Sequence, residues 1–279
     1  MDGVTLGIAA GEVVGIAGPN GAGKSTLISM LLGFLPPDRG TVRLDGLDPR
    51  AFIEREGVAY LPELMTIPLQ WTVESALDRL ATLSAIAPAE RLGARERVID
   101  AVGIGEHRLK RLKALSKGNL QRLGLAQALL ADRRVVVFDE PTHGLDPLWT
   151  ARFREIVAGL RRADRAILIA SHNLDELERL CDRVAIVDKG RIQRVVDVRE
   201  AAGATGTPRR WRLRALAGCD ALAAQFADAT VHGDLVECDA DLASLNRGIA
   251  MAIAQGALIS SVTPAESSLE EAFRTAVAR

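Results

Sequence analysis

The chain has 279 residues, of which 48% are hydrophobic and 25% charged, and its formal net charge at pH 7 is −1. This composition indicates a folded protein with either one large domain or a large domain and a small one, and the near-zero charge gives no general support for a nucleic-acid partner. The three cysteines are widely spaced and form no Cys-x-x-Cys pair. A zinc site or a disulfide framework is therefore not expected, and a reducing cytoplasm fits best.

The chain contains no apolar run of the roughly 18 residues that cross a bilayer. Its first residues, Met1–Val4, have neither the basic region nor the apolar core of a signal peptide. If the protein works at a membrane, we therefore expect another chain to span it.

Short runs in which nearly every position is apolar alternate with helical patterns along the first 200 residues. Such runs predict an α/β fold with a mostly parallel sheet that helices cover on both faces. The predicted strands are Val13–Ala17, Val135–Asp139, Ala166–Ala170 and Val184–Asp188, and the predicted helices are Lys24–Leu35, Pro147–Arg162 and Leu174–Leu180. The stretch from Thr72 to Ala131 has helical patterns without a strand, which predicts a helical insertion over about residues 66–130.

A linker is predicted at Ala201–Pro208, between a large domain of residues 1–200 and a small one of residues 209–279. In the small domain the predicted elements are the strand Trp211–Ala215, the helix Ala221–Ala227, the hairpin strands Thr230–His232 and Leu235–Cys238, the helix Leu242–Gln255, the strand Leu258–Val262 and the helix Ser268–Ala278. The first six have the order βαββαβ, which is that of a ferredoxin-like α+β domain.

A glycine-rich loop follows the first predicted strand and fits the pattern G-x-x-x-x-G-K-[S/T]. Glycines let successive backbone N–H groups turn toward an anion at a helix N-terminus. Lys24 then supplies a charge to the β- and γ-phosphates, and the Ser25 hydroxyl ligates Mg²⁺. The strand before the loop and the helix after it argue against a chance glycine-rich turn. We therefore expect ATP to bind at Gly18, Pro19, Asn20, Gly21, Ala22, Gly23, Lys24, Ser25 and Thr26.

Two carboxylates, Asp139 and Glu140, follow the buried strand that begins at Val135. Ligands bind at this end of the strands in doubly wound sheets. We expect Asp139 to hold Mg²⁺ through its water shell and Glu140 to orient or deprotonate the attacking water. The alternative interpretation is a strand that ends in an ordinary solvated turn. The phosphate loop upstream favours the functional interpretation over this one.

His172 follows another apolar run, Ala166–Ser171, and is expected at the same edge of the sheet. A neutral imidazole there can hydrogen-bond the γ-phosphate or the attacking water. A lone histidine is more often structural, and it is the position after a neighbouring strand that favours the functional interpretation.

In their order along the chain, these motifs resemble those of the ATP-binding cassette (ABC) ATPases. Between the phosphate loop and the acidic pair, Leu115–Arg122 matches the family signature Leu-Ser-Gly-Gly-Gln, and Gly144-Leu145-Asp146 matches the family's D-loop. The resemblance covers about residues 1–197. It implies a head-to-tail dimer, in which ATP lies between the phosphate loop of one subunit and Ser116 and Gly118 of the other, with Asp146 across the interface.

Within the family, export-type (ABC-2 type) transporter ATPase subunits are resembled by two features: the variant Leu-Ser-Lys-Gly at Leu115–Gly118, followed by Gln121-Arg122-Leu123, and the ending Pro264–Phe273. The resemblance implies a peripheral subunit at the cytoplasmic face of the membrane that powers export through a separate permease. It also implies that the helical insertion holds the groove for a coupling helix of that permease. The alternative is a soluble ABC ATPase that acts on ribosomes or DNA. A regulatory, inactive cassette is disfavoured because Lys24, Asp139, Glu140 and His172 are all present.

Three positions depart from the family pattern. Asn119 replaces the signature glutamine and keeps the ability to donate and accept hydrogen bonds. Glu63 stands where the family has a glutamine that contacts Mg²⁺ and the water, and we expect it to sense the hinge between the core and the insertion. Met1 lies 17 residues before Gly18, whereas the family has a further strand and an aromatic residue that stacks on adenine about 25 residues before this loop, so that either the true start lies upstream or the stacking aromatic is absent. For the chain as given we therefore expect weaker and less selective binding of the base.

Overall fold

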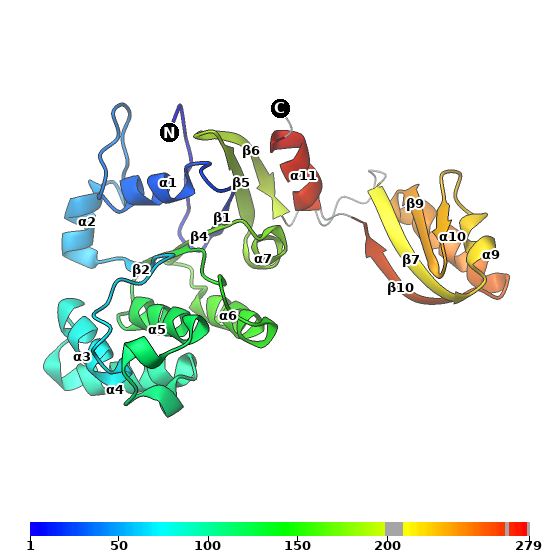
Figure 1. The fold of residues 1–279 in the computed structure, drawn as a ribbon. Helices are drawn as coiled ribbons and strands as arrows, with labels where there is room; N and C mark the ends of the chain where they lie inside the picture. Colours follow the sequence, from blue (N-terminus) through cyan, green and yellow to red (C-terminus); the bar gives the residue numbers. More distant parts are fainter. Residues whose placement is uncertain (199–208, 266–267, 278–279) are drawn as a thin grey trace. The chain divides into compact units, whose positions relative to one another are not determined.

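The structure is a computed structural model that describes residues 1–198, 209–265 and 268–277. The chain divides into two compact units, Met1–Val196 and Asp197–Arg279 (Figure 1). The linker predicted at Ala201–Pro208 lies outside the described residues.

A six-stranded sheet forms the centre of the first unit, in the order β2-β3-β4-β1-β5-β6. Its strands are β1 (Val13–Ala17), β2 (Ala59–Leu61), β3 (Val135–Asp139), β4 (Ala166–Ser171), β5 (Arg183–Asp188) and β6 (Arg191–Asp197). The neighbouring pairs from β2 to β5 run parallel. Because only Lys189 and Gly190 join β5 to β6, β6 returns antiparallel along the edge of the sheet. The sheet is therefore mixed.

Strand register brings three strand ends together at one edge of this sheet. Ala17, the last residue of β1, pairs with Ser171, and Asp139, the last residue of β3, pairs with Ala170. The residues that follow β1, β3 and β4 therefore lie side by side.

Helices cover both faces of the sheet, with α1 on one side and α5 and α6 on the other (Figure 1). On the α1 side, Ile28 and Leu32 pack in a buried cluster with Ile16, Val137 and Leu168. The helices of this unit are α1 (Lys24–Leu31), α2 (Pro49–Glu56), α3 (Val73–Leu83), α4 (Pro88–Ala101), α5 (Lys117–Leu129), α6 (Pro147–Leu160) and α7 (Leu174–Leu180), with 3-10 turns at Gly105–His107 and Leu112–Ala114.

The predicted insertion contains α3, α4 and α5 and has no strand between residues 72 and 131. Thr72 caps α3 in a reciprocal pair of hydrogen bonds: Thr72 Oγ1 accepts from the Ser75 N–H at 3.2 Å, and Ser75 Oγ accepts from the Thr72 N–H at 3.0 Å. Arg95 of α4 pairs with Glu74 of α3 at 2.9 Å, which joins the two helices.

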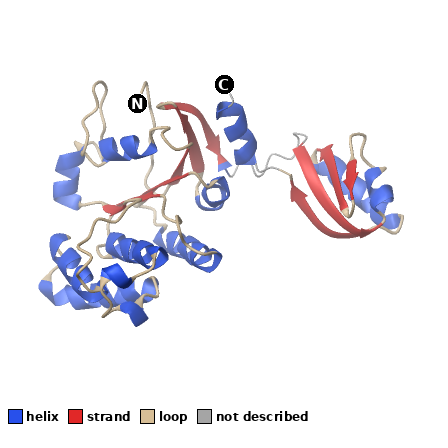
Figure 2. Ribbon diagram, in the orientation of Figure 1, coloured by secondary structure: helices blue, strands red, loops and turns tan. Residues whose placement is uncertain are grey.

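The second unit contains a four-stranded antiparallel sheet in the order β10-β7-β9-β8. Its elements are β7 (Arg209–Ala217), α9 (Cys219–Ala223), β8 (Thr230–His232), β9 (Leu235–Ala240), α10 (Leu242–Ala254), β10 (Leu258–Pro264) and α11 (Ser268–Val277). Figure 2 shows α9 and α10 on one face of this sheet. On β7 the buried Leu213 and Ala215 alternate with the exposed Arg212 and Arg214, so the opposite face is polar.

Some predicted bounds are wrong. The helix predicted over Lys24–Leu35 ends at Leu31, because Gly33 adopts the left-handed conformation with φ +69°. The helix predicted at Ala221–Ala227 instead occupies Cys219–Ala223, since Gly218 (φ +77°) starts it earlier. Two strands were not predicted. β2 is only three residues long, and in β6 polar residues such as Arg191, Gln193 and Arg194 interrupt the apolar ones because this strand lies at the exposed edge of the sheet.

Candidate active site

The loop between β1 and α1 has the backbone that its glycines permit. A Cβ atom at Gly18 would lie 2.4 Å from the carbonyl oxygen of Val187, and Gly21 and Gly23 have φ of +80° and +109°. A side chain at Gly18 would displace the neighbouring β5, and Gly21 and Gly23 have left-handed backbones that L side chains rarely adopt. The loop thereby leads directly into the N-terminus of α1, where unpaired N–H groups attract an anion.

Lys24 begins α1 and folds its side chain back over the loop. Its Nζ donates to the carbonyl oxygens of Gly18 at 2.9 Å and Pro19 at 3.4 Å, and lies 3.5 Å from Oε1 of Glu140. Although charged, Lys24 is buried, with 7% of its surface exposed. Its ammonium group therefore joins the phosphate loop to the carboxylate after β3.

Asp139 is the last residue of β3 and is 3% exposed. Burial raises its pKa to about 6, with smaller contributions in the same direction from the charges of Glu140 and Glu63, against a hydrogen bond from Ser25 and the charge of Lys24. Within the described chain, no group donates a hydrogen bond to Oδ1 of Asp139. A buried carboxylate oxygen without a donor, next to a hydroxyl, fits a hard divalent cation such as Mg²⁺.

This pair of oxygen donors is only part of a cation site. Among the residues that the structure describes, no three His, Cys, Asp or Glu side chains are grouped to hold a metal ion. Mg²⁺ usually keeps several waters and is held by one or two carboxylates together with substrate phosphates. Ser25 and Asp139 therefore fit Mg²⁺ that arrives with a nucleotide, with the remaining ligands from phosphate and water.

Glu140 directly follows β3 and has φ of +49°, in the left-handed region that non-glycine residues seldom adopt. Its N–H donates to the carbonyl oxygen of Ala170 at 2.8 Å, and its carboxylate Oε2 lies 2.8 Å from Nδ1 of His172. The side chain is 7% exposed. A buried carboxylate is therefore held between the ammonium group of Lys24 and the imidazole of His172.

Two histidines lie over this carboxylate. His172, directly after β4, has 57% of its side chain exposed. His143 was not among the residues expected from the sequence, although it follows the acidic pair closely; its ring centre lies 6.3 Å from that of His172. Both rings line the same cavity as the phosphate loop.

That cavity has a volume of about 410 Å³. Its lining residues are Pro19, Asn20, Gly21, Gly23, Lys24, Ser25, Thr26, Glu63, Asp139, Glu140, His143 and His172. Of the other expected residues in the loop, Gly18 and Ala22 lie beneath it, with Ala22 3% exposed. Glu63 reaches the cavity from the segment after β2 and is exposed to solvent.

Ser116, Gly118 and Asp146 do not line the cavity. Ser116 caps α5 by accepting a hydrogen bond from the Asn119 N–H at 3.2 Å, and Asp146 caps α6 by accepting from the Trp149 N–H at 2.9 Å. The two caps lie near each other, because a Cβ atom at Gly118 would be 3.2 Å from the carbonyl oxygen of Gly144. Ser116, Gly118 and Asp146 therefore lie near one another, outside the cavity that contains the phosphate loop of the same chain.

Gln121 of α5 contacts the site, although its place in the signature match did not predict this. It is buried, with 7% of its surface exposed, and its amide donates to the carbonyl oxygens of Glu140 at 3.2 Å and Pro141 at 3.1 Å. Although it lies within the signature match Leu115–Arg122, that match does not reveal this contact, since its partners lie about 20 residues later in the chain.

Comparison with protein families gives a match to the model described as "ABC transporter" over residues 1–143. A second model, "AAA domain, putative AbiEii toxin, Type IV TA system", matches residues 111–178. Within the described residues, no helix has the length and apolar character to cross a bilayer.

Three curated relatives show how far the similarity extends. An ABC transporter ATP-binding protein of Nostoc is 38% identical over 69% of this chain and 58% of its own length. The ABC transporter ATP-binding protein YdbJ of Bacillus subtilis is 32% identical over 97% of this chain and 88% of its own length. The Nod factor export ATP-binding protein I of Paraburkholderia xenovorans is 35% identical over 68% of this chain and 64% of its own length.

Among solved structures, one titled "Structure of ATP binding subunit of ABC transporter" superposes with a TM-score of 0.66 at 28% identity, covering 73% of this chain and 85% of its own. The fold of that structure, the family model that matches half of this chain and the relative that is similar over 97% of it all indicate the same family. This chain belongs to the ABC transporter family, among its ATP-binding proteins.

Proposed function

We propose that this chain is the ATP-hydrolysing subunit of an exporter and acts with a separate membrane permease. The observation that carries the proposal is the Glu140 carboxylate, which lies beside the phosphate loop between Lys24 and His172. That is the arrangement required of a base that faces the terminal phosphate of a bound nucleotide.

The proposed reaction assigns a role to each residue. The phosphates of ATP lie on the N–H groups of Gly18–Thr26, with Lys24 against the β- and γ-phosphates. Ser25 and Asp139 hold Mg²⁺, which when bound neutralises charge on the phosphates. Glu140 takes the proton of the attacking water as its oxygen bonds to the γ-phosphorus, and the bond to the β–γ bridging oxygen breaks to release ADP. His172 orients Glu140 and the water. Glu63, which lines the same cavity, would help to hold the cation and the water there.

Substitution of Glu140 tests this reaction. In Glu140→Gln the base is lost while the magnesium site remains, so we expect phosphate release to fall more than about 100-fold, with ATP affinity changed less than about threefold. In Lys24→Ala we expect nucleotide affinity itself to weaken, because the cation that faces the phosphates is gone. Phosphate release and equilibrium nucleotide binding measure the two effects. Undiminished hydrolysis by Glu140→Gln would exclude the proposed base.

A head-to-tail dimer is the second part of the proposal. Ser116, Gly118 and Asp146 lie outside the cavity that contains Lys24, so they are free to face the nucleotide of a second copy. The N-terminus of α5, with its capped hydroxyl and backbone N–H groups, is suited to an anion. ATP bound between two copies would complete both sites.

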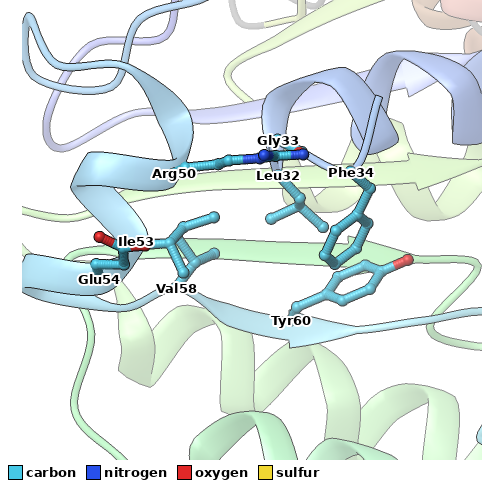
Figure 3. A pocket seen from close by; sticks show the side chains of 8 residues that line it. All are labelled: Leu32, Gly33, Phe34, Arg50, Ile53, Glu54, Val58 and Tyr60. Carbon is cyan, nitrogen blue, oxygen red and sulfur yellow. The ribbon is translucent and has the colours of Figure 1, made fainter. Parts of the chain in front are cut away.

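The permease is the third part, and a surface cavity supports it. The cavity has a volume of about 500 Å³ between the end of α1, α2 and β2 (Figure 3). Phe34, 67% exposed, and Tyr60 lie beside each other with ring centres 6.4 Å apart. Tyr60 belongs to β2, which leads to Glu63 in the active-site cavity. We propose that a short amphipathic helix of the permease docks here, outside the helical insertion in which the family resemblance had placed the groove, so that docking and hydrolysis share β2. The chain is then peripheral at the cytoplasmic face of the membrane.

Phe34→Glu tests the docking surface. A charge at this exposed apolar site should abolish co-purification with a co-expressed candidate permease, while ATP hydrolysis by the isolated subunit stays within about twofold. Met251→Glu, on a methionine that is 55% exposed on α10, is the control and should co-purify normally. Equal retention of both variants would remove this surface from the proposal, and recovery of the chain with ribosomes instead would favour a soluble role.

The domain organisation remains a proposal as well. We propose an ATPase domain of residues 1–200 with a helical subdomain of about residues 66–130, and a ferredoxin-like domain of residues 209–279. The strand order β10-β7-β9-β8 together with the βαββαβ sequence of elements supports the second assignment.

A further inference from the structure

The backbone at Glu140 is held from two sides. Its N–H donates to the carbonyl oxygen of Ala170 on β4 at 2.8 Å, and its own carbonyl oxygen accepts both from the amide of Gln121 on α5 at 3.2 Å and, within the local turn, from the N–H of His143 at 3.1 Å. Between these bonds the residue has φ of +49°. Such a conformation costs on the order of 1–3 kcal/mol in a non-glycine residue and persists only where its surroundings determine it.

The direction of the Glu140 side chain depends on this conformation. A change to the ordinary right-handed or extended backbone would turn the Cβ bond, and with it the carboxylate, away from Lys24 and His172. Gln121 also donates to the carbonyl oxygen of Pro141 at 3.1 Å, so one buried amide fixes two successive peptide groups. These hydrogen bonds are shielded from solvent, because only 7% of the surface of Gln121 is exposed.

We propose that Gln121 is a positioning residue for hydrolysis, which holds the left-handed backbone of Glu140 and makes the direction of its carboxylate depend on the position of α5. The inference rests on the proposed role of Glu140 as the base. Gln121 itself does not line the active-site cavity, so it acts through Glu140 and not on the nucleotide.

Gln121 lies close to the N-terminus of α5 and so connects that end of the helix to Glu140. The helix begins after its cap Ser116, five residues earlier, at the surface that we propose faces a second copy. At 1.5 Å per residue the distance along the axis is about 7.5 Å, within one rigid helix. A shift of α5 when the second copy binds its nucleotide is therefore transmitted to the main chain of Glu140 through the Gln121 amide.

The test is Gln121→Met, which keeps the volume of the side chain but removes the donor. We expect the single-turnover rate of ATP hydrolysis to fall about 10- to 100-fold, while equilibrium ATP binding changes less than about threefold, because only the alignment of the base is lost. The matched control is Gln127→Met, the same change six residues later on the same helix, where the side chain lines a different cavity. It should hydrolyse ATP at close to the unmodified rate.

A double-mutant cycle separates positioning from a general structural effect. Once Glu140→Gln has removed the base, adding Gln121→Met should slow single-turnover hydrolysis less than about twofold further. A full-rate Gln121→Met variant, or one that slows hydrolysis equally with and without Glu140, overturns the inference. If Gln121→Met does not fold, Gln121→Asn keeps a buried amide but withdraws it by one methylene, and the same expectations apply. Failure of the proposed function is distinct, because Glu140→Gln alone would then keep hydrolysing ATP.

Discussion

At the scale of single residues, the active site depends on a few positions where the backbone or the solvation is unusual. Gly18 has no room for a side chain against Val187, and Glu140 is held in the left-handed region. Asp139 combines burial with an oxygen that no described group hydrogen-bonds, which raises its pKa to about 6. Each of these features costs stability in the folded chain. Together they prepare a site for phosphates and a cation.

Glu12, directly before β1, has a lowered pKa and therefore stabilises the fold, in contrast to Asp139. Its carboxylate accepts hydrogen bonds from Arg183 and from the Ala9 N–H, and the bond from Arg183 holds its pKa below the usual 4.5. The ionised form of a group with a lowered folded pKa stabilises the fold above the unfolded pKa, and that stability is lost as the pH falls through the folded pKa. Glu12 therefore ties the start of β1 to β5 at neutral pH.

We expect Glu12→Gln to lower the melting temperature at pH 7 by roughly 2–4 °C, since a half-buried ion pair contributes about 1 kcal/mol. The difference from the unmodified chain should shrink as the pH falls below about 4.5, where the carboxylate becomes protonated. Thermal unfolding followed by circular dichroism at several pH values measures this. Glu155→Gln, in an exposed pair with Arg152, is the control and should change little. A difference independent of pH would refute the role of the Glu12 charge.

At the scale of elements, α5 connects most parts of the first unit. Most of its residues are buried, which leaves almost no exposed polar face. Gly124 lets it approach β2 closely: a Cβ atom there would lie 2.7 Å from Leu61 Cδ1 and 2.9 Å from Met65 Sδ. The same helix carries Gln121, and Arg122 stacks 3.7 Å above the Trp149 ring of α6. A helix packed on every side moves only as a rigid body.

Gly124→Ala should therefore destabilise the chain by about 1–3 kcal/mol, because the added methyl group overpacks the contact with β2 by more than the gain in helix propensity. Gly159→Ala on α6 is the matched control: nothing lies within 4 Å of its Cβ position, so it should stabilise by about 0.5–1 kcal/mol. Chemical denaturation measures both. Equal stabilisation by the two alanines would show that the α5–β2 contact has room for a side chain.

At the scale of the whole molecule, the residues that we propose form the two halves of a nucleotide site lie apart in one copy. Lys24 and Glu140 line one cavity, whereas Ser116 and Gly118 lie outside it at the start of α5. A single copy therefore cannot enclose the phosphates from both sides with these residues. The second unit has its own buried cluster, formed by the sheet with α9 and α10, which gives it an independent core.

Ser116→Asp tests the two-copy arrangement. Aspartate also caps a helix, so α5 should be preserved, but its charge repels the phosphates held by the other copy. In the Glu140→Gln background, which retains ATP, we expect Ser116→Asp to abolish ATP-dependent dimers while ATP binding to the monomer changes less than about threefold. Ser116→Asn, a neutral cap, should still dimerise. Light scattering after gel filtration measures the mass, and equal dimerisation of both variants would contradict the arrangement.

Much of this protein follows from short-range sequence patterns. The apolar runs of β1 and β3 have the predicted bounds, because a strand buried on both faces needs apolar side chains at nearly every position. The phosphate loop and the carboxylates after β3 are equally local, since glycine at fixed spacing and a strand that ends in acidic residues can be recognised without knowing what surrounds them. The family resemblance rests on the same motifs, and the comparisons confirm it.

Tertiary structure alone decided the rest. The edge strand β6 is half exposed, and β2 is so short that its pairing with β3 defines it more than its sequence does. Gln121 has an ordinary place in a helix, and its contact with Glu140 exists only because α5 packs against the end of β3. His143 likewise becomes part of the cavity through the strand order. The phosphate loop could be predicted because its residues are nine consecutive ones, whereas the groups that contact the Glu140 carboxylate and main chain come from elements distant in the chain.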